Sequence, residues 1–139
     1  MTHIASATAT STAAPEAFFT KWADMATWPE WNGDTEWVTL DGPFVQGATG
    51  TLKPKGGPKT SFVVAELTDR SFVDVSKLFG ARLTFDHRIV TGEQTTVSVS
   101  ISIDGPLAFF WTKILGGDLA KSVQADLDSL VTFAEAVRA

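Results

Sequence analysis

His87 and Asp74 are the residues whose types and spacing are best suited to acid–base chemistry in this chain. If Phe79-Gly80 is a two-residue hairpin turn, the flanking segments pair so that Phe72 faces His87 and Asp74 faces Phe85 on one surface. Asp74 is then diagonal to His87, at roughly 7 to 8 Å between backbones, where a carboxylate reaches an imidazole directly or through water. This spacing predicts that Asp74 orients His87 and that His87 moves a proton.

The same two residues also fit a purely binding role. In an apolar interior, a carboxylate and an imidazole can satisfy each other or backbone groups and serve as a polar anchor for a ligand or for the core. We favour binding over catalysis. His3 is the only other histidine, there is no cysteine, and no cluster of carboxylates accompanies either histidine. We therefore expect no metal site and no cofactor.

Composition places the chain among single-domain globular proteins. Its 139 residues suit one domain spanning residues 1–139, with a core of its own. Ten Phe and five Trp with no Tyr predict an interior rich in purely apolar rings. Trp22, Trp28, Trp31 and Trp37 are expected to be core and helix-packing residues rather than a ligand cage.

Charge and hydropathy argue against several classes of partner. A net charge of −5 and a pI near 4.8 disfavour binding to a phosphate backbone, so no nucleic-acid partner is expected. The first fourteen residues lack the charged start and apolar run of a signal peptide, and no stretch reaches the roughly 18 apolar residues of a membrane span. We expect a cytoplasmic protein without an integral membrane segment, as a monomer or homodimer.

The elements that must position these residues begin with one strand and two helical segments. Thr2 to Ser11 alternates small, polar and β-branched residues and predicts a first strand. Pro15 suits the first turn of a helix running through Asp24, and the Trp-rich segment Thr27 to Gly33 suits a second helical turn that stops at Asn-Gly.

Turn signals then divide the middle of the chain into six further strands. Consecutive strands joined by such short turns must be antiparallel. The predicted strands are Thr35 to Leu40, Ala48 to Lys53, Lys59 to Leu67, Ser71 to Leu78, Ala81 to Thr91 and Gln94 to Ile103.

Alternation of residue types indicates which face of each strand is buried. Leu83, Phe85, His87 and Ile89 share one side of their strand, so His87 is expected to face inward. In the last strand the apolar set is Val97, Val99, Ile101 and Ile103, and a short loop at 92–94 would put Ile89 opposite Val97. The run Phe62-Val63-Val64 leaves the inward face of the 59–67 strand undecided.

A long helix follows Asp104-Gly-Pro106. Its apolar positions step by three and four and predict one continuous stripe packed on the sheet, formed by Leu119, Val123, Leu127, Leu130, Ala134 and Val137. Gly116-Gly117 predicts a kink or local break, which would let the turns that carry Trp111 move as a lid.

The order strand, two helices, six strands and long helix resembles the helix-grip fold of the START-like (SRPBCC, Bet v 1-like) superfamily, in its polyketide cyclase/dehydrase-like branch. The resemblance covers nearly the whole chain. It implies an α+β fold in which a seven-stranded curved antiparallel sheet wraps around the C-terminal helix. The segments that carry it are Trp22-Ala-Asp, Trp28-Pro-Glu-Trp31-Asn, Gly50 to Pro58, Phe85-Asp-His87 and Asp104-Gly-Pro-Leu107.

The resemblance further implies a cavity between sheet and helix, entered past Pro54 to Pro58 and Phe79-Gly80. Six basic residues would surround that mouth and steer an anionic amphiphile, although solubilising lysines scattered on turns are the more common origin of such surface charge. This basic rim consists of Lys53, Lys55, Lys59, Lys77, Arg82 and Lys113.

The function predicted from the sequence is binding of a hydrophobic or amphipathic, anionic small molecule such as a lipid or polyketide. The pocket is expected to be lined by Phe72, Asp74, Ser76, Leu83, Phe85, His87, Val99, Ile101, Trp111 and Leu115. One alternative is a cofactor-independent polyketide cyclase or dehydrase with His87 as the acid/base. A second is a protein-interaction module without a functional cavity, docking through the sheet.

Overall fold

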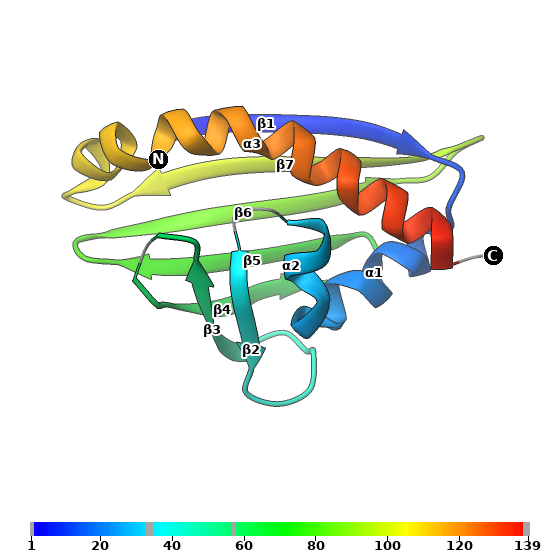
Figure 1. Ribbon diagram of the computed structural model, residues 1–139, viewed down its shortest axis with the longest axis horizontal. Helices are drawn as coiled ribbons and strands as arrows, with labels where there is room; N and C mark the ends of the chain where they lie inside the picture. Colours follow the sequence, from blue (N-terminus) through cyan, green and yellow to red (C-terminus); the bar gives the residue numbers. More distant parts are fainter. Residues whose placement is uncertain (1, 33–34, 57, 138–139) are drawn as a thin grey trace.

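A single antiparallel sheet of seven strands forms one layer of the molecule, in the spatial order β1-β7-β6-β5-β4-β3-β2 (Figure 1). The computed structural model describes residues 2–32, 35–56 and 58–137. The strands are β1 (Thr2–Ser11), β2 (Thr35–Leu40), β3 (Thr49–Pro54), β4 (Thr60–Leu67), β5 (Ser71–Leu78), β6 (Ala81–Val90) and β7 (Thr95–Asp104). The predicted strands are confirmed to within two residues at each end.

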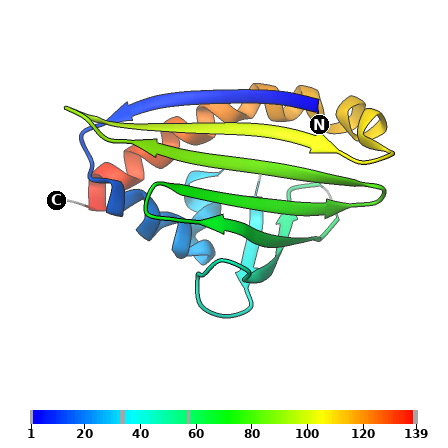
Figure 2. The same cartoon turned by 180° about the vertical axis from the view of Figure 1, so that it is seen from behind.

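The helices form the second layer on the inner face of this curled sheet (Figures 1 and 2). Pro15 opens α1 (Pro15–Ala23), where its missing N–H costs no hydrogen bond, and a short 3-10 turn (Met25–Thr27) leads into α2 (Trp28–Trp31). The predicted stop at Gly33 lies outside the described residues. The long helix α3 (Ala108–Val137) follows β7 and lies across β1 and β7.

The helix α3 runs through Gly116 and Gly117 without a break, so of the predicted kink or local break, the break is wrong. Each glycine costs a helix interior about 1 kcal/mol. That cost is outweighed because Val123, Leu127, Leu130 and Ala134 are all buried on one stripe, which confirms the predicted packing face. The side chain of Val137 lies outside the described part.

Strand register is as the sequence predicts at the positions that matter for the site. Phe72 pairs with His87 and Asp74 with Phe85, and Ile89 pairs with Val97. In β4 the undecided face is settled by burial, because Phe62 and Val64 point into the core. A register shift between Val64 and Glu66 then interrupts the regular pairing of β4 with β5, so the residues after Val64 do not continue its alternation.

No helix within residues 2–32, 35–56 and 58–137 is both long enough and apolar enough to cross a bilayer. The core instead lies between the sheet and the helices, and aromatic rings dominate it: Phe18, Trp22 and Phe72 are fully enclosed.

Candidate functional site

The inner faces of three adjacent strands bring together most of the residues expected to line a ligand pocket. Register places Leu83, Phe85 and His87 of β6 opposite Ile103, Ile101 and Val99 of β7, and opposite the inward residues of β5. The eight expected sheet residues therefore form one continuous surface: Phe72, Asp74, Ser76, Leu83, Phe85, His87, Val99 and Ile101.

His87 is held in this surface by a backbone carbonyl and two rings. Its Nδ1 lies 2.9 Å from the carbonyl oxygen of Phe72. The imidazole stacks on the ring of Phe72, with centroids 4.8 Å apart and planes 13° apart, and the Trp22 ring lies 5.1 Å away. Because a carbonyl oxygen only accepts, Nδ1 carries the proton in this hydrogen bond, and Nε2 of the neutral ring is an acceptor.

The surroundings of His87 favour its neutral form. Burial among the rings lowers the pKa of His87 to about 4, against the opposing effects of the Phe72 carbonyl and the charge of Asp86. At neutral pH the imidazole is therefore uncharged, and its unprotonated Nε2 is the ring nitrogen that can accept a hydrogen bond or a proton from a bound molecule.

Asp74 is a buried carboxyl with an unused acceptor atom. Its side chain is 6% exposed, between Val64 of β4 and Phe85 of β6 in the register. Burial raises the pKa of Asp74 to about 7, although its own backbone N–H opposes the shift. Its Oδ1 has no hydrogen-bond partner among the described residues, and a buried polar atom without a partner is costly to keep.

Asp74 does not hold His87 directly. The nitrogen that orients the imidazole is bonded to the Phe72 carbonyl, and the two side chains form no ion pair in the part of the chain that the structure describes. Both groups nevertheless face the same interior surface, as the register predicted. They are thus two separate polar points in an apolar wall.

Two buried indole N–H groups accompany this pair. Trp22 and Trp31 are buried as predicted, yet neither Nε1 atom has a partner, whereas Trp28 Nε1 donates to the Trp22 carbonyl oxygen at 3.2 Å. Trp37 differs, since it is 37% exposed. The aromatic core therefore holds unused donors as well as an unused acceptor, which the sequence reasoning did not identify.

Trp111 and Leu115 come from the first turns of α3 and are half-buried against the core. The indole Nε1 of Trp111 donates to the Phe79 carbonyl oxygen at 2.7 Å, so its polar edge is tied to the β5–β6 turn rather than directed at Asp74 or His87. Trp111, which was expected to bring α3 into the site, is thus anchored to the Phe79-Gly80 turn, where the resemblance implied the entrance of the cavity.

The loops that carry the basic rim gather at one end of the molecule, where the β3–β4 connection, the β5–β6 turn and the start of α3 lie (Figures 1 and 2). Two members are paired: Lys53 with Glu36 at 2.9 Å and Arg82 with Asp104 at 3.2 Å. The other four are exposed and form no ion pair among the described residues: Lys55, Lys59, Lys77 and Lys113.

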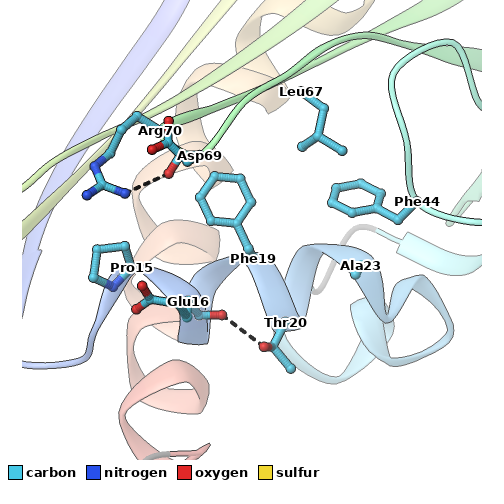
Figure 3. Close-up of a pocket in the computed structure, with 9 residues that line it drawn as sticks. All are labelled: Pro15, Glu16, Phe19, Thr20, Ala23, Phe44, Leu67, Asp69 and Arg70. Carbon is cyan, nitrogen blue, oxygen red and sulfur yellow. Dashed lines mark hydrogen bonds between the residues drawn. The ribbon is translucent and has the colours of Figure 1, made fainter.

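Two hollows in the described part of the chain lie elsewhere. One is an open groove of about 470 Å³ between α1 and the β2–β3 and β4–β5 loops (Figure 3). Phe19, Phe44 and Leu67 converge on it, with Arg70 and Glu16 at its edge. The other, of about 480 Å³, lies beside the β6–β7 loop. Neither is lined by the expected pocket residues.

The groove nevertheless connects to the aromatic wall. The ring of Phe44 lies 5.2 Å from that of Phe72 in an edge-to-face arrangement, and Phe72 stacks on His87. On the α1 side, Phe19 packs edge-to-face on Trp22. Sequence reasoning missed Phe44 because it stands alone in a turn-rich segment, where no periodicity assigns a face.

No group of three or more His, Cys, Asp or Glu residues within the described ranges is arranged to hold a metal ion. The polar atoms of the inner face are instead suited to hydrogen bonds with an uncharged or weakly polar group, since His87 is uncharged and Asp74 partly protonated at neutral pH, and both lie among rings.

Comparison with known proteins supports the fold. No family model matches the sequence, and no curated protein matches it either. Solved structures match at low identity: a protein of Thermus thermophilus has 14% identity and a TM-score of 0.72, with 97% of this chain and 99% of that chain covered. A START superfamily protein from Mycobacterium smegmatis has 15% identity and a TM-score of 0.69, over 97% and 99%.

A third similar structure is the di-domain ARO/CYC protein StfQ from the steffimycin biosynthetic pathway. It has 14% identity and a TM-score of 0.75, and the match covers 99% of this chain and 52% of StfQ. At such identities the likeness concerns the fold. The element order and the curled seven-stranded sheet with its long C-terminal helix are those of the START-like, helix-grip fold.

Proposed function

Starting from a START-like, helix-grip fold, we propose that this protein binds a hydrophobic or amphipathic small molecule, such as a lipid or a polyketide, between the inner face of β5–β7 and the helices. The observation that carries the proposal is the buried Oδ1 of Asp74, which lacks a partner among the described residues and lies in a mostly apolar wall. A ligand hydroxyl or carbonyl would supply that partner.

Two polar groups in this wall, the uncharged His87 and the partly protonated Asp74, suit recognition of a weakly polar ligand. Asp74, with its pKa raised to about 7, is partly protonated at neutral pH, so its carboxyl can donate as well as accept. The Nε2 of His87 accepts, because its Nδ1 is engaged with the Phe72 carbonyl. Surrounding rings provide the apolar contact that most of the ligand's surface requires.

The basic end supports an anionic head group. The segments that carry the four exposed rim lysines lie at the end of the molecule that contains the start of α3. None of these lysines forms an ion pair within the described ranges. An anionic head would stay in water beside them while the tail enters the interior. Entry requires side chains to move, and the half-buried first turns of α3 are the segment best placed to do so.

The proposal is tested by native mass spectrometry of the purified protein, followed by titration of the delipidated protein with a fluorescent fatty acid that carries a hydroxyl group along its chain, which can reach Asp74 while the carboxylate stays in water. We expect saturable binding that weakens by about tenfold in Asp74→Leu, because the ligand then loses a hydrogen bond to a buried polar group. Asp118→Leu, at an exposed position of α3, makes the same substitution away from the inner face, serves as the matched control and should bind as the wild type does.

Two further variants distinguish a pocket from surface adsorption. Leu83→Trp should block binding by filling the inner face, while Thr84→Trp, its neighbour on the outer face, should not. A protein that carries no ligand and binds no probe, or one in which both Trp variants bind normally, would rule out an interior site.

A second candidate function is cofactor-independent cyclisation or dehydration of a polyketide-like substrate. The specific observation in its favour is the neutral His87 with an unprotonated Nε2 on the same inner face as a protonatable Asp74. A proton would pass from a carbon flanked by carbonyls to Nε2, while the Asp74 carboxyl donates to the developing enolate oxygen. Loss of turnover with retained affinity in His87→Gln would support this role, and loss of affinity alone would support binding.

Docking of a protein on the sheet is not favoured by its outer face. The solvent side of β6 and β7 carries hydroxyls and charges rather than an apolar patch, as Asp86 and Arg88 form an ion pair there at 2.7 Å. The outward residues of these strands are Arg82, Thr84, Asp86, Arg88, Val90, Thr96, Ser98, Ser100, Ser102 and Asp104, and Val90 is the one large apolar side chain in this list.

A further inference from the structure

Four large apolar side chains are exposed together at one end of the molecule. Phe79, in the β5–β6 turn, is 82% exposed, and Phe109, Phe110 and Ile114, on the outer side of the first turns of α3, are 67%, 47% and 50% exposed. We call these four residues the tip. Single exposed apolar residues are common on protein surfaces, whereas a cluster of several large ones usually marks an interaction site.

The turn and the helix that form the tip are joined into one unit. Trp111 Nε1 donates to the Phe79 carbonyl oxygen at 2.7 Å, and the Leu107 N–H donates to the Gly80 carbonyl oxygen at 2.9 Å. Gly80 has a φ of +71°, and a side chain there would collide with Leu107. Phe79 is therefore held out at the apex of the turn by the contacts of its neighbours.

The tip is surrounded by charge of the opposite sign to the rest of the chain. Segments 76–85 and 104–115 contain Lys77, Arg82 and Lys113 against Asp104, a local charge of 3 − 1 = +2. Because the whole chain carries −5, the remainder carries −5 − 2 = −7. Lys77 and Lys113 are exposed and have no ion-pair partner in the part that the structure describes.

The position of the tip favours a bilayer over a protein partner. The β5–β6 turn and the start of α3 lie at the extreme of the molecule's long axis (Figures 1 and 2). A stable protein interface buries a broad surface of about 800 Å² on each partner. The tip is instead a narrow end with projecting rings and flanking lysines. Membrane-binding segments that insert between the lipid head groups and acyl chains have the same combination.

We propose that the tip docks this protein on an anionic lipid bilayer, with Phe79, Phe109, Phe110 and Ile114 inserted at the interface and Lys77 and Lys113 on the lipid head groups. The rings supply the apolar contact and the lysines supply the preference for anionic lipid. The docking does not depend on an interior ligand, so it is measured on delipidated protein.

The experiment is co-sedimentation with vesicles of phosphatidylcholine containing phosphatidylglycerol, compared with vesicles of phosphatidylcholine alone. The wild type should sediment with the anionic vesicles at low salt and be released at high salt. The double variant Phe79→Asp/Phe109→Asp should bind at least about tenfold more weakly. The charge variant Lys77→Glu/Lys113→Glu should lose the preference for anionic vesicles.

Val90→Asp is the matched control. Val90 is 64% exposed but lies at the far end of β6 from the tip, so its substitution should leave vesicle binding unchanged. All the substituted residues are exposed, and circular dichroism checks that each variant is folded. The proposal fails if the wild type stays in solution with anionic vesicles, or if Val90→Asp weakens binding as much as the tip variant. It also fails if the tip instead forms a dimer that Phe79→Asp abolishes.

Discussion

Asp74 and His87 sit in one aromatic wall, and burial drives each toward its uncharged form, but with opposite consequences for stability. Burial raises the pKa of Asp74 to about 7 and lowers the pKa of His87 to about 4. The unfolded values are 3.8 and 6.5. Between each pair of values the folded and unfolded chains differ by one bound proton, so each residue makes the free energy of unfolding depend on pH.

The two dependences have opposite signs. Between pH 3.8 and about 7 the unfolded chain has released the Asp74 proton while the folded chain still holds it, so stability falls as pH rises. Between about pH 4 and 6.5 the unfolded chain has bound a proton on His87 while the folded chain has not, so stability rises with pH. In the wild type the two contributions largely offset each other over this range.

Replacing one of these two residues should reveal how the other makes stability depend on pH. Asp74→Asn removes the loss of stability that Asp74 causes as pH rises. The free energy of unfolding of the variant, minus that of the wild type, should therefore increase from pH 3.8 to 7 by up to roughly 4 kcal/mol. In His87→Gln the difference should run the other way between about pH 4 and 6.5. Urea unfolding at a series of pH values measures both. If the free energies of unfolding of Asp74→Asn and wild type depend on pH in the same way, then the buried Asp74 carboxyl does not keep its proton in the folded protein.

Among the elements, β3 and α3 make opposite uses of glycine. Gly50 of β3 is buried where the strand lies between β2 and β4, and a Cβ there would overlap the Thr39 carbonyl oxygen and the Phe62 ring. Gly117 of α3 is exposed, and a Cβ there meets nothing within 4 Å. The first glycine permits close strand packing, whereas the second only lowers the helix propensity of its segment.

This contrast predicts opposite effects of the same substitution. Gly50→Ala should lower the free energy of unfolding by about 2 to 3 kcal/mol, because the Thr39 backbone has no room to yield. Gly117→Ala should raise it by about 0.5 to 1 kcal/mol, because alanine favours the helix that already continues through this position. Thermal and urea unfolding of the pair measure both effects. Equal effects would refute the steric argument for β3.

The elements also show which parts of the fold a sequence can predict. The pairing of Phe72 with His87 followed from a two-residue turn, because such a turn fixes the register of both strands. The inward face of β4 could not be predicted, since Phe62-Val63-Val64 is apolar in both directions and only packing selects Phe62 and Val64. The break at Gly116 was predicted from local propensity, which the buried stripe further along α3 overrides.

The candidate site was predictable only in part for a similar reason. Alternation along β6 placed His87 inward, but alternation says nothing about which atom holds its ring, and that atom is the Phe72 carbonyl oxygen rather than Asp74. The groove at Phe44 depends on α1 and two loops far apart in the chain, and the loops have no periodicity that predicts their position, so locating it required the structure.

At the scale of the whole molecule, charge is distributed unevenly along the long axis. The net charge is −5, yet six of the eleven basic residues belong to the rim near the start of α3. An acidic protein with a basic end attracts an anion to that end and repels it elsewhere, so association with an anionic ligand is steered by the field. This argument rests on the proposed ligand-binding function.

Steering predicts that charge controls the rate at which a fatty acid binds. The association rate of a fluorescent fatty acid, measured by stopped flow, should fall as salt is raised and should fall roughly tenfold in Lys55→Glu/Lys59→Glu. The matching fatty alcohol should show neither effect, because it carries no charge. Lys121→Glu, on an exposed position of α3 outside the rim, is the control and should retain the wild-type rate. A fatty acid rate independent of salt and of the rim lysines would show that entry is governed by side-chain movement alone, with the basic end serving another purpose.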